Sequence, residues 1–198
     1  MRVIAIIPAR GGSKRLPRKN IVEFMGKPLI AHSIEACKNC KWISDIYVSS
    51  EDQEILQVAS AHGAIPLERP TSLADDTTPK VIAIRQAVQD SKVGKLERND
   101  IIAIVQANSP EMTADHLDLG FDLMLKKSLW EVMSADADGV QNAAFRLVRH
   151  HALFNDFLSA HCGFVIAPIA DIHTQNDLET LEIKIKSNNQ SGAGQSNP

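Results

Sequence analysis

The chain has 198 residues, of which 44% are hydrophobic and 23% are charged, and its net charge at pH 7 is -3. This length and composition are typical of a single globular domain with a buried core. The slightly negative charge argues against a general nucleic-acid binder, and no apolar run reaches the roughly 18 residues that a membrane span needs.

Strands and helices alternate along the first part of the chain. Continuous apolar runs at residues 3–7 and 101–105 are typical of strands buried on both faces, and shorter runs at 46–48 and 64–67 predict two more strands. Helices are expected from Pro28, after the capping-box pattern Ser50-Glu51-Asp52-Gln53, from Thr78-Pro79 and after Thr113, each with an apolar stripe at helical spacing.

The last third is less regular. We expect short strands near 131–134, 143–148 and 163–166, a short helix near 151–158, and a final helix capped at 174–177 that ends at about Lys186. Residues 1–186 then form a single domain, and the polar tail at 187–198 is expected to be disordered.

Alternation of this kind predicts an α/β fold, in which a Rossmann-like, mostly parallel sheet is sandwiched by helices. Ligands of such sheets bind beyond the carboxyl ends of the strands. The segment that follows the first predicted strand is therefore the first place to look for a site.

That segment holds two glycines and five cations within the sequence P-A-R-G-G-S-K-R-L-P-R-K-N, residues 8–20. Glycines let the backbone approach a ligand closely, and backbone N–H groups together with Lys and Arg form an anion cradle. So much charge in a small space indicates a polyphosphate. The Walker pattern and the dinucleotide pattern G-x-G-x-x-G are both missing from the sequence, and a solvated basic loop is the alternative.

Cys37 and Cys40 form a C-x-x-C pattern, which could be redox-active or half of a zinc site. Only Cys162 and scattered histidines are left to complete such a site. An odd number of cysteines and an N-terminal apolar run too short for a secretion signal argue against a disulfide scaffold, and we expect a cytoplasmic protein. We favour the interpretation that both cysteines are small apolar side chains on one helix.

The loop at 8–20 resembles the signature loop of the acylneuraminate (CMP-sialic acid) cytidylyltransferase family. Further segments resemble the family's motifs in the same order: residues 26–30, 48–52, 69–78, 106–110 and 171–174. The resemblance implies a fold of the nucleotide-diphospho-sugar transferase type. It also implies transfer of CMP from CTP to an acidic keto-sugar such as N-acetylneuraminate, legionaminate or pseudaminate, with Mg²⁺ as cofactor and pyrophosphate as the second product.

The resemblance also implies roles for individual residues. The implied nucleotide-binding residues are Pro8, Ala9, Arg10, Gly11, Gly12, Ser13, Lys14, Lys19, Asn20, Arg69 and Lys80. The implied sugar-binding residues are Gln106, Asn108, Ser109 and Asn142, and the implied metal ligands are Asp171 and His173. Arg10, Lys19 and Asp171 are the expected catalytic residues, because a cage of cations and a metal ion stabilises the charge of the transition state and of the leaving pyrophosphate.

The sequence departs from the family at several points. His173 stands where the family has a second aspartate, and Mg²⁺ prefers oxygen ligands. Glu111 and Met112 replace the family's leucine and arginine, so that a carboxylate could face an acidic sugar. The segment that forms the family's sugar lid and dimerisation arm is missing, which puts the homo-dimer implied by the resemblance in doubt.

Two alternatives follow from these departures. The chain could be a non-catalytic or partner-dependent nucleotide-binding relative, or it could use another acidic acceptor such as 3-deoxy-octulosonate or a phosphonate. A second basic group, formed by Arg146, Arg149, His150 and His151, could bind an acceptor anion, although a solvated helix face is the favoured interpretation.

Overall fold

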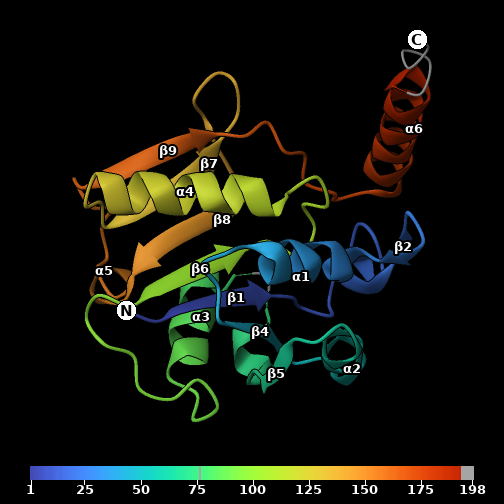
Figure 1. The fold of residues 1–198 in the computed structure, drawn as a ribbon. Coiled ribbons are helices and arrows are strands. Elements are labelled where there is room, and N and C mark those ends of the chain that lie inside the picture. Colours follow the sequence, from blue (N-terminus) through green and yellow to red (C-terminus); the bar gives the residue numbers. More distant parts are fainter. Residues whose placement is uncertain (76, 193–198) are drawn as a thin grey trace.

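The computed structural model describes residues 1–75 and 77–192 (Figure 1). Its strands are β1 (Val3–Pro8), β2 (Glu23–Phe24), β3 (Lys27–Pro28), β4 (Asp45–Ser50), β5 (Ile65–Glu68), β6 (Ile101–Val105), β7 (Glu131–Ala135), β8 (Gln141–Arg149) and β9 (Cys162–Ile166). Its α-helices are α1 (Leu29–Asn39), α2 (Gln53–Ala61), α3 (Lys80–Val88), α4 (Ala114–Lys126), α5 (His150–Leu153) and α6 (Gln175–Gly192). Two 3-10 turns, η1 (Lys19–Ile21) and η2 (Thr71–Leu73), complete the described elements.

Seven of the described strands form one sheet in the order β5-β4-β1-β6-β8-β7-β9. β5, β4, β1 and β6 run parallel to one another, as do β7 and β9, whereas β8 is antiparallel to both of its neighbours. The expected mostly parallel sheet is therefore confirmed. The order reverses direction at β1, the strand that leads into the basic loop, and this is where α/β sheets open a crevice for ligands.

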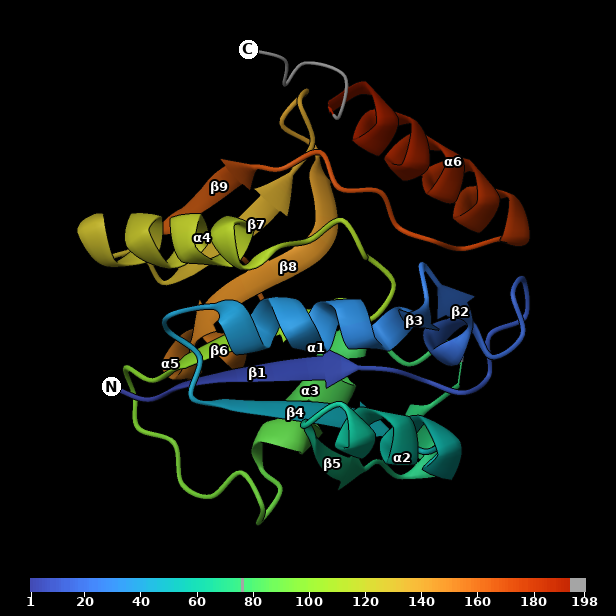
Figure 2. The same cartoon turned by 45° about the vertical axis from the view of Figure 1, so that its right-hand side comes forward.

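Helices cover both faces of this sheet (Figures 1 and 2). Alternate residues of β1 point to opposite sides, since a strand has a side-chain period of two. Ala5 and Ile7 pack in the cluster that includes buried residues of α1, α2 and α4, whereas Ile4 and Ile6 pack with buried residues of α3 and α5. Burial on both faces explains the unbroken apolar run of this strand.

A third, smaller cluster lies beside the basic loop and joins it to the segment before α6 and to α6 itself. Leu16 of the loop and Phe24 of β2 pack with Leu178 and Leu181 of α6, and Leu29 and Ile172 complete the cluster. α6 stands apart from the sheet and from the helices that cover it (Figure 1). The first turns of α6 are therefore held against the loop, whereas Ile183 further along is 69% exposed.

The predicted elements are found, with differences at their ends. Asp52, not Ser50, caps α2, because β4 continues through Ser50 and the helix begins two residues later than expected. The expected helix at 151–158 is only α5, since the chain turns away after Leu153. The hairpin of β2 and β3 was not predicted; its turn places Met25 and Gly26 at positive φ, where asparagine-glycine is the usual signal.

The last helix was expected to end at about Lys186, but α6 continues to Gly192, the first glycine after its start, and the expected disorder of the tail stays a prediction. Residues 193–198, the rest of the expected tail, lie outside the described residues. Within residues 1–75 and 77–192, no helix is both long enough and apolar enough to cross a membrane.

Candidate nucleotide site

A cavity of about 540 Å³ opens at the carboxyl ends of the central strands. Pro8 ends β1, Arg69 follows β5 and Gln106 follows β6. Residues at the ends of these strands therefore line the same cavity. Most of the residues predicted to bind ligands line this cavity: Pro8, Arg10, Ser13, Lys14, Lys19, Asn20, Arg69, Lys80, Gln106, Asn108 and His173.

Six predicted residues do not line the cavity: Ala9, Gly11, Gly12, Ser109, Asn142 and Asp171. Ser109 is fully buried and donates to the Asp171 carboxylate. The side-chain amide of Asn142 donates to the carbonyl of Ala167 at 2.5 Å. Ser109 and Asn142 therefore serve contacts within the protein in this structure, and direct roles for them toward a sugar stay predictions.

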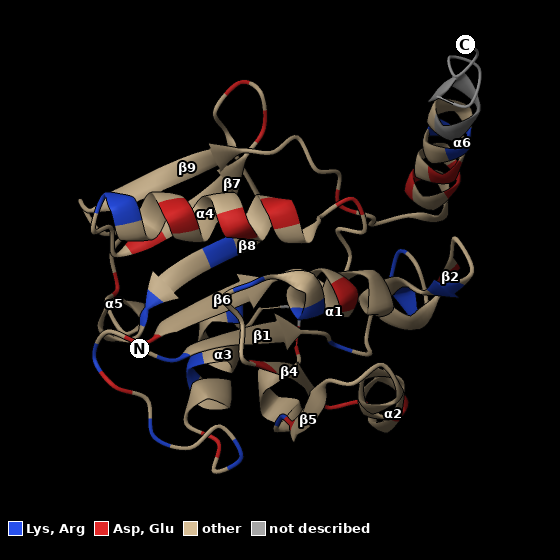
Figure 3. Cartoon of the chain, viewed as in Figure 1, with Lys and Arg blue, Asp and Glu red and all other residues tan. Residues whose placement is uncertain are grey.

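Four of the five cations in the loop line the cavity: Arg10, Lys14, Arg15 and Lys19. The loop carries much of the basic charge at this end of the sheet (Figure 3). Arg18 is the exception, since its guanidinium pairs with Asp52 and Glu54 at the start of α2. Arg18 also has a left-handed backbone, with φ at 57°. This ion-paired arginine anchors the loop, while the other four cations concentrate positive charge around the cavity.

Lys19 and Lys80 both line the cavity, and their like charges interact. Burial lowers the pKa of Lys19, and the positive charges of Lys80, Arg15 and Arg10 lower it further, while Asp171 opposes the shift. The Lys80 ammonium donates to the side-chain oxygen of Gln106 at 2.9 Å. Crowded like charges of this kind are relieved when an anion binds between them.

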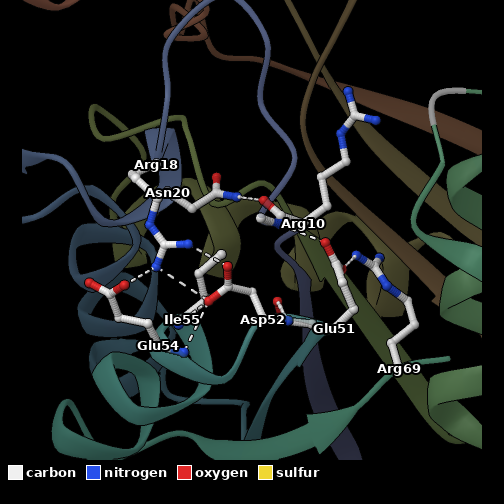
Figure 4. Close-up of polar contacts among 10 residues, drawn as sticks. Arg10, Arg18, Asn20, Glu51, Asp52, Glu54, Ile55 and Arg69 are labelled. Carbon is white, nitrogen blue, oxygen red and sulfur yellow. Dashed lines mark hydrogen bonds and ion pairs between the residues drawn. The ribbon is translucent and has the colours of Figure 1, made fainter. Parts of the chain in front are cut away.

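Glu51 and Asp52, which directly follow β4, contact the basic loop at Gly11 and Arg18 (Figure 4). Glu51 accepts from the Gly11 N–H at 2.7 Å and from the Arg69 guanidinium at 2.5 Å. Burial alone would raise the pKa of Glu51, but these donors lower it below its ordinary value. A Cβ added at Gly11 would lie 2.5 Å from an oxygen of Asp52, so only glycine fits this contact. The Gly11 N–H, expected to face a phosphate, is instead engaged by Glu51.

Asp171 and His173 lie at the edge of the cavity, before α6. Oδ2 of Asp171 is 4.0 Å from Nε2 of His173. Burial and the charges of Lys19 and Arg15 lower the pKa of His173, so its imidazole is neutral at physiological pH, the form that binds metals. Within residues 1–75 and 77–192, no three His, Cys, Asp or Glu side chains cluster as a metal site.

This donor set fits a metal ion that takes its other ligands from a nucleotide. Mg²⁺ is commonly held by one or two carboxylates together with substrate phosphates, and Asp171 supplies one carboxylate beside four cavity cations that would attract phosphates. His173 is a poorer ligand for Mg²⁺ than an aspartate would be.

The remaining candidate residues have other partners. Glu111 is absent from the cavity lining; it pairs with Lys184 of α6 at 2.8 Å and accepts from the amide of Ala170. In the second basic group, Arg146 and Arg149 lie on β8, so the expected helix face is wrong for them, whereas His150 and His151 lie on α5. Arg146 pairs with the buried Glu131, and Arg149 donates to the carbonyls of Leu129 and Asn99.

The cysteines are free, and both members of the C-x-x-C pattern are buried. Burial raises the pKa of the Cys40 thiol to about 12, and the Cys40 thiol donates to Asp118. Burial raises the pKa of Cys37 as well. Low-pKa thiolates are the reactive form of cysteine, so neither residue is suited to redox chemistry. The interpretation as small apolar side chains agrees with this burial, although only Cys37 lies within α1.

Several residues that had no expected ligand role also lie at the cavity or support it. Leu73, Asp75, Thr78 and Ala83 complete the lining with Arg15. Asp75 accepts hydrogen bonds from the amides and hydroxyls of Thr77 and Thr78 and so shapes the turn before α3. An aspartate two residues before a threonine is a recognisable turn signal that could have found this one. Glu51 had no comparable signal, because its partners are remote in sequence.

Comparison with known proteins places this arrangement in a family. A family model described as cytidylyltransferase matches residues 4–155. Pseudaminic acid cytidylyltransferases of two Campylobacter jejuni strains are 49% identical over 90 residues, covering 45% of this chain and 39% of the relative, and 36% identical over 127 residues, covering 64% and 54%. CMP-N,N'-diacetyllegionaminic acid synthase of Legionella pneumophila is 48% identical over 79 residues, covering 39% and 34%. The chain thus spans about half or less of these relatives' lengths.

Solved structures share the fold at lower identity. A CMP:2-keto-3-deoxy-manno-octonic acid synthetase complexed with CTP has a TM-score of 0.77 at 16% identity, covering 95% of this chain and all of the other. A cytidylyltransferase from Leptospira borgpetersenii has a TM-score of 0.71 at 18% identity, covering 100% of this chain and 99% of the other. The fold type is confirmed, and because the family model matches well over half of the sequence, this chain belongs to the cytidylyltransferase family.

Proposed function

We propose that this protein transfers CMP from CTP to the anomeric hydroxyl of an acidic keto-sugar and releases pyrophosphate. The observation that carries the proposal is the cavity itself, where four cations of one loop and Lys80 of α3 surround a space of about 540 Å³. A triphosphate is the ligand whose charge best matches this set.

In the proposed reaction, the anomeric oxygen of the sugar forms a bond to the α-phosphorus of CTP, and its proton is released to solvent water. The bond between the α-phosphorus and the bridging oxygen breaks, and pyrophosphate leaves with that electron pair. Negative charge grows on the leaving group, where Arg10, Lys14 and Lys19 are proposed to stabilise it. Cations held in place before the reaction stabilise such charge without further reorganisation.

A divalent metal, with Mg²⁺ as the proposed ion, would be held by Asp171 and by phosphate oxygens. It would supply neutralisation of phosphate charge and help align the triphosphate. Ser109 donates to Asp171 and fixes the orientation of the carboxylate. His173 lies nearby and would contact the same ion only through its neutral imidazole.

The proposed nucleoside end of the cavity involves Asn20 and Arg69. Asn20 is 5% exposed and its amide donates to the carbonyl of Arg10 at 2.8 Å, which fixes the loop as well as the side chain. Arg69 has a buried Nε with no hydrogen-bond partner among the described residues, although it lines the cavity. Such a buried donor is expected to find an acceptor on a bound ligand.

The proposed acceptor is a sialic acid-like sugar acid. Two of the relatives described above, at 49% and 48% identity, are named for pseudaminic acid and diacetyllegionaminic acid, both acidic sugars. Gln106 and Asn108 are the proposed sugar contacts, since they line the cavity from the loop after β6. Pairing of Glu111 with Lys184 supports this, because that carboxylate is neutralised by a partner rather than facing the cavity.

The test is pyrophosphate release from CTP and Mg²⁺ with N-acetylneuraminate, legionaminate, pseudaminate, 3-deoxy-octulosonate and small phosphonates as acceptors. Release with one of the sugar acids supports the proposal and names the acceptor. Failure of all acceptors, together with saturable CTP binding, would instead favour a non-catalytic or partner-dependent nucleotide-binding protein.

A further inference from the structure

Glu51 links the basic loop at Gly11 to Arg69 (Figure 4). Glu51 itself does not line the cavity. Its Oε1 accepts from the Gly11 N–H at 2.7 Å, and its Oε2 accepts from Nη2 of Arg69 at 2.5 Å. The Glu51 side chain is 15% exposed and the Arg69 side chain 5%. One carboxylate therefore binds the loop backbone with one oxygen and the Arg69 guanidinium with the other.

The guanidinium of Arg69 contacts this carboxylate at one edge. Among the described residues, Glu51 is the only side chain that forms a hydrogen bond or ion pair with the guanidinium of Arg69. The Nε of Arg69 is buried without a partner. A guanidinium held at one edge keeps its remaining donors at a fixed orientation, because the group is planar.

The same carboxylate also contacts the loop, at its first glycine. Gly11 is packed so closely on Asp52 that a Cβ would lie 2.9 Å from the Cβ of Asp52. The hydrogen bond to Glu51 fixes the Gly11 backbone against that contact. Arg10, which lines the cavity, directly precedes this fixed point.

We propose that Glu51 is a positioning residue that holds Arg69 and the start of the basic loop in the arrangement needed for nucleotide binding. This inference rests on the proposed function of the cavity. Glu51 does not touch the nucleotide; it acts through the guanidinium of Arg69 and through the backbone at Gly11. Its removal should weaken nucleotide binding although no cavity-lining residue has changed.

The chain offers a matched control three residues further on. Glu54 is a second glutamate, in the first turn of α2, and like Glu51 it pairs with an arginine, Arg18. Arg18 does not line the cavity, and the Glu54 side chain is 64% exposed. Loss of the Glu54 carboxylate removes one partner of Arg18 and leaves Asp52 as the other.

The experiment measures CTP affinity by calorimetry in wild type, Glu51→Gln and Glu54→Gln. We expect Glu51→Gln to raise the Kd for CTP by about 10-fold or more, which corresponds to about 1.4 kcal/mol, and Glu54→Gln to change it less than about 2-fold. Melting curves of the three proteins report whether each is folded. A folded Glu51→Gln protein with wild-type affinity would overturn the inference.

A double-mutant cycle with Arg69→Met separates positioning from general support. If Glu51 acts through Arg69 as well as through Gly11, adding Glu51→Gln to Arg69→Met should weaken CTP binding by a smaller factor than Glu51→Gln does in wild type, because only the contact with Gly11 is left to lose. Losses that multiply fully would overturn the proposed route through Arg69. A structural effect elsewhere would be felt in both backgrounds.

A third measurement does not require the variant to fold. The Gly11 amide of the wild-type protein should exchange slowly with deuterium in the absence of nucleotide, since Glu51 accepts its hydrogen bond. Exchange as fast as an unprotected amide would overturn the inference. A wild-type protein that binds no CTP overturns the proposed function and this inference together, whereas unchanged affinity in Glu51→Gln overturns this inference alone.

Discussion

The side-chain amide of Asn108 donates to the carbonyl of Ile172 at 2.9 Å, and the amide of Ile172 donates to the carbonyl of Asn108 at the same distance. This reciprocal pair joins the loop after β6 to the segment before α6, although 64 residues separate them. It brings Asp171 and His173, the neighbours of Ile172, to the edge of the cavity. Asn108, predicted as a sugar contact, therefore also positions the candidate metal ligands.

Replacement of Asn108 by alanine should destabilise the protein by about 1–3 kcal/mol, since the buried amide bond is lost and the carbonyl of Ile172 loses a donor. Urea unfolding measures this change. Asn155→Ala is the control, because Asn155 is exposed, and it should change stability by less than about 0.5 kcal/mol. Equal stability of the two variants would contradict the role of Asn108.

The two glycines of the loop should respond differently to substitution by alanine. Gly11→Ala places a Cβ against Asp52 and should cost about 1–3 kcal/mol of folding free energy, whereas a Cβ at Gly12 meets no atom within 4 Å. Thermal or denaturant unfolding of both variants provides the comparison. A Gly12→Ala protein as unstable as Gly11→Ala would show that the loop packs differently in solution.

Asp171→Asn should abolish most metal-dependent turnover and leave CTP affinity within about 3-fold of wild type, because the carboxylate is proposed to hold the metal and not the nucleotide. Steady-state rates at several Mg²⁺ concentrations and calorimetry with CTP separate the two effects. Asp122→Asn, on the exposed face of α4, is the control. Near-normal turnover in Asp171→Asn would remove Asp171 from the metal site.

Lys19 should lose its proton at a lower pH than an ordinary lysine, because burial and the charge of Lys80 lower its pKa. If its positive charge is needed to bind CTP, kcat/KM for CTP falls as the pH rises through this lowered pKa. Lys80→Met removes one repelling charge, so the fall should move to higher pH even though the overall rate is lower. A profile that keeps its midpoint in Lys80→Met would contradict the coupling of the two lysines.

Local patterns in the sequence were enough to predict most of the fold and much of the cavity. The apolar run at 3–7 identified β1, and the cations that follow it identified one wall of the site, because both features are continuous in sequence. The pairing of β8 with β6 and β7 was less evident, since its polar residues interrupt the pattern and Arg146 pairs with Glu131 across the sheet.

Contacts between remote residues explain what the sequence did not reveal. Arg18 looked like a fifth cation for a ligand, but Asp52 and Glu54 engage it after the chain folds back. The Gly11 amide was expected to face an anion, and Glu51, 40 residues later, accepts its hydrogen bond. Spacing within one segment gives no information about a partner that only tertiary structure supplies.

Calorimetric binding of CTP, compared with UTP, GTP and ATP, to wild type and Arg10→Ala in the presence of Mg²⁺ tests directly whether the cavity binds a nucleoside triphosphate. We expect saturable binding that is strongest for CTP, with affinity reduced about 10-fold or more in Arg10→Ala, because one cation of the triphosphate cage is lost. Equal affinity for all four nucleotides would contradict the assignment of the base site, and unchanged CTP affinity in Arg10→Ala would contradict the assignment of the cavity to a triphosphate.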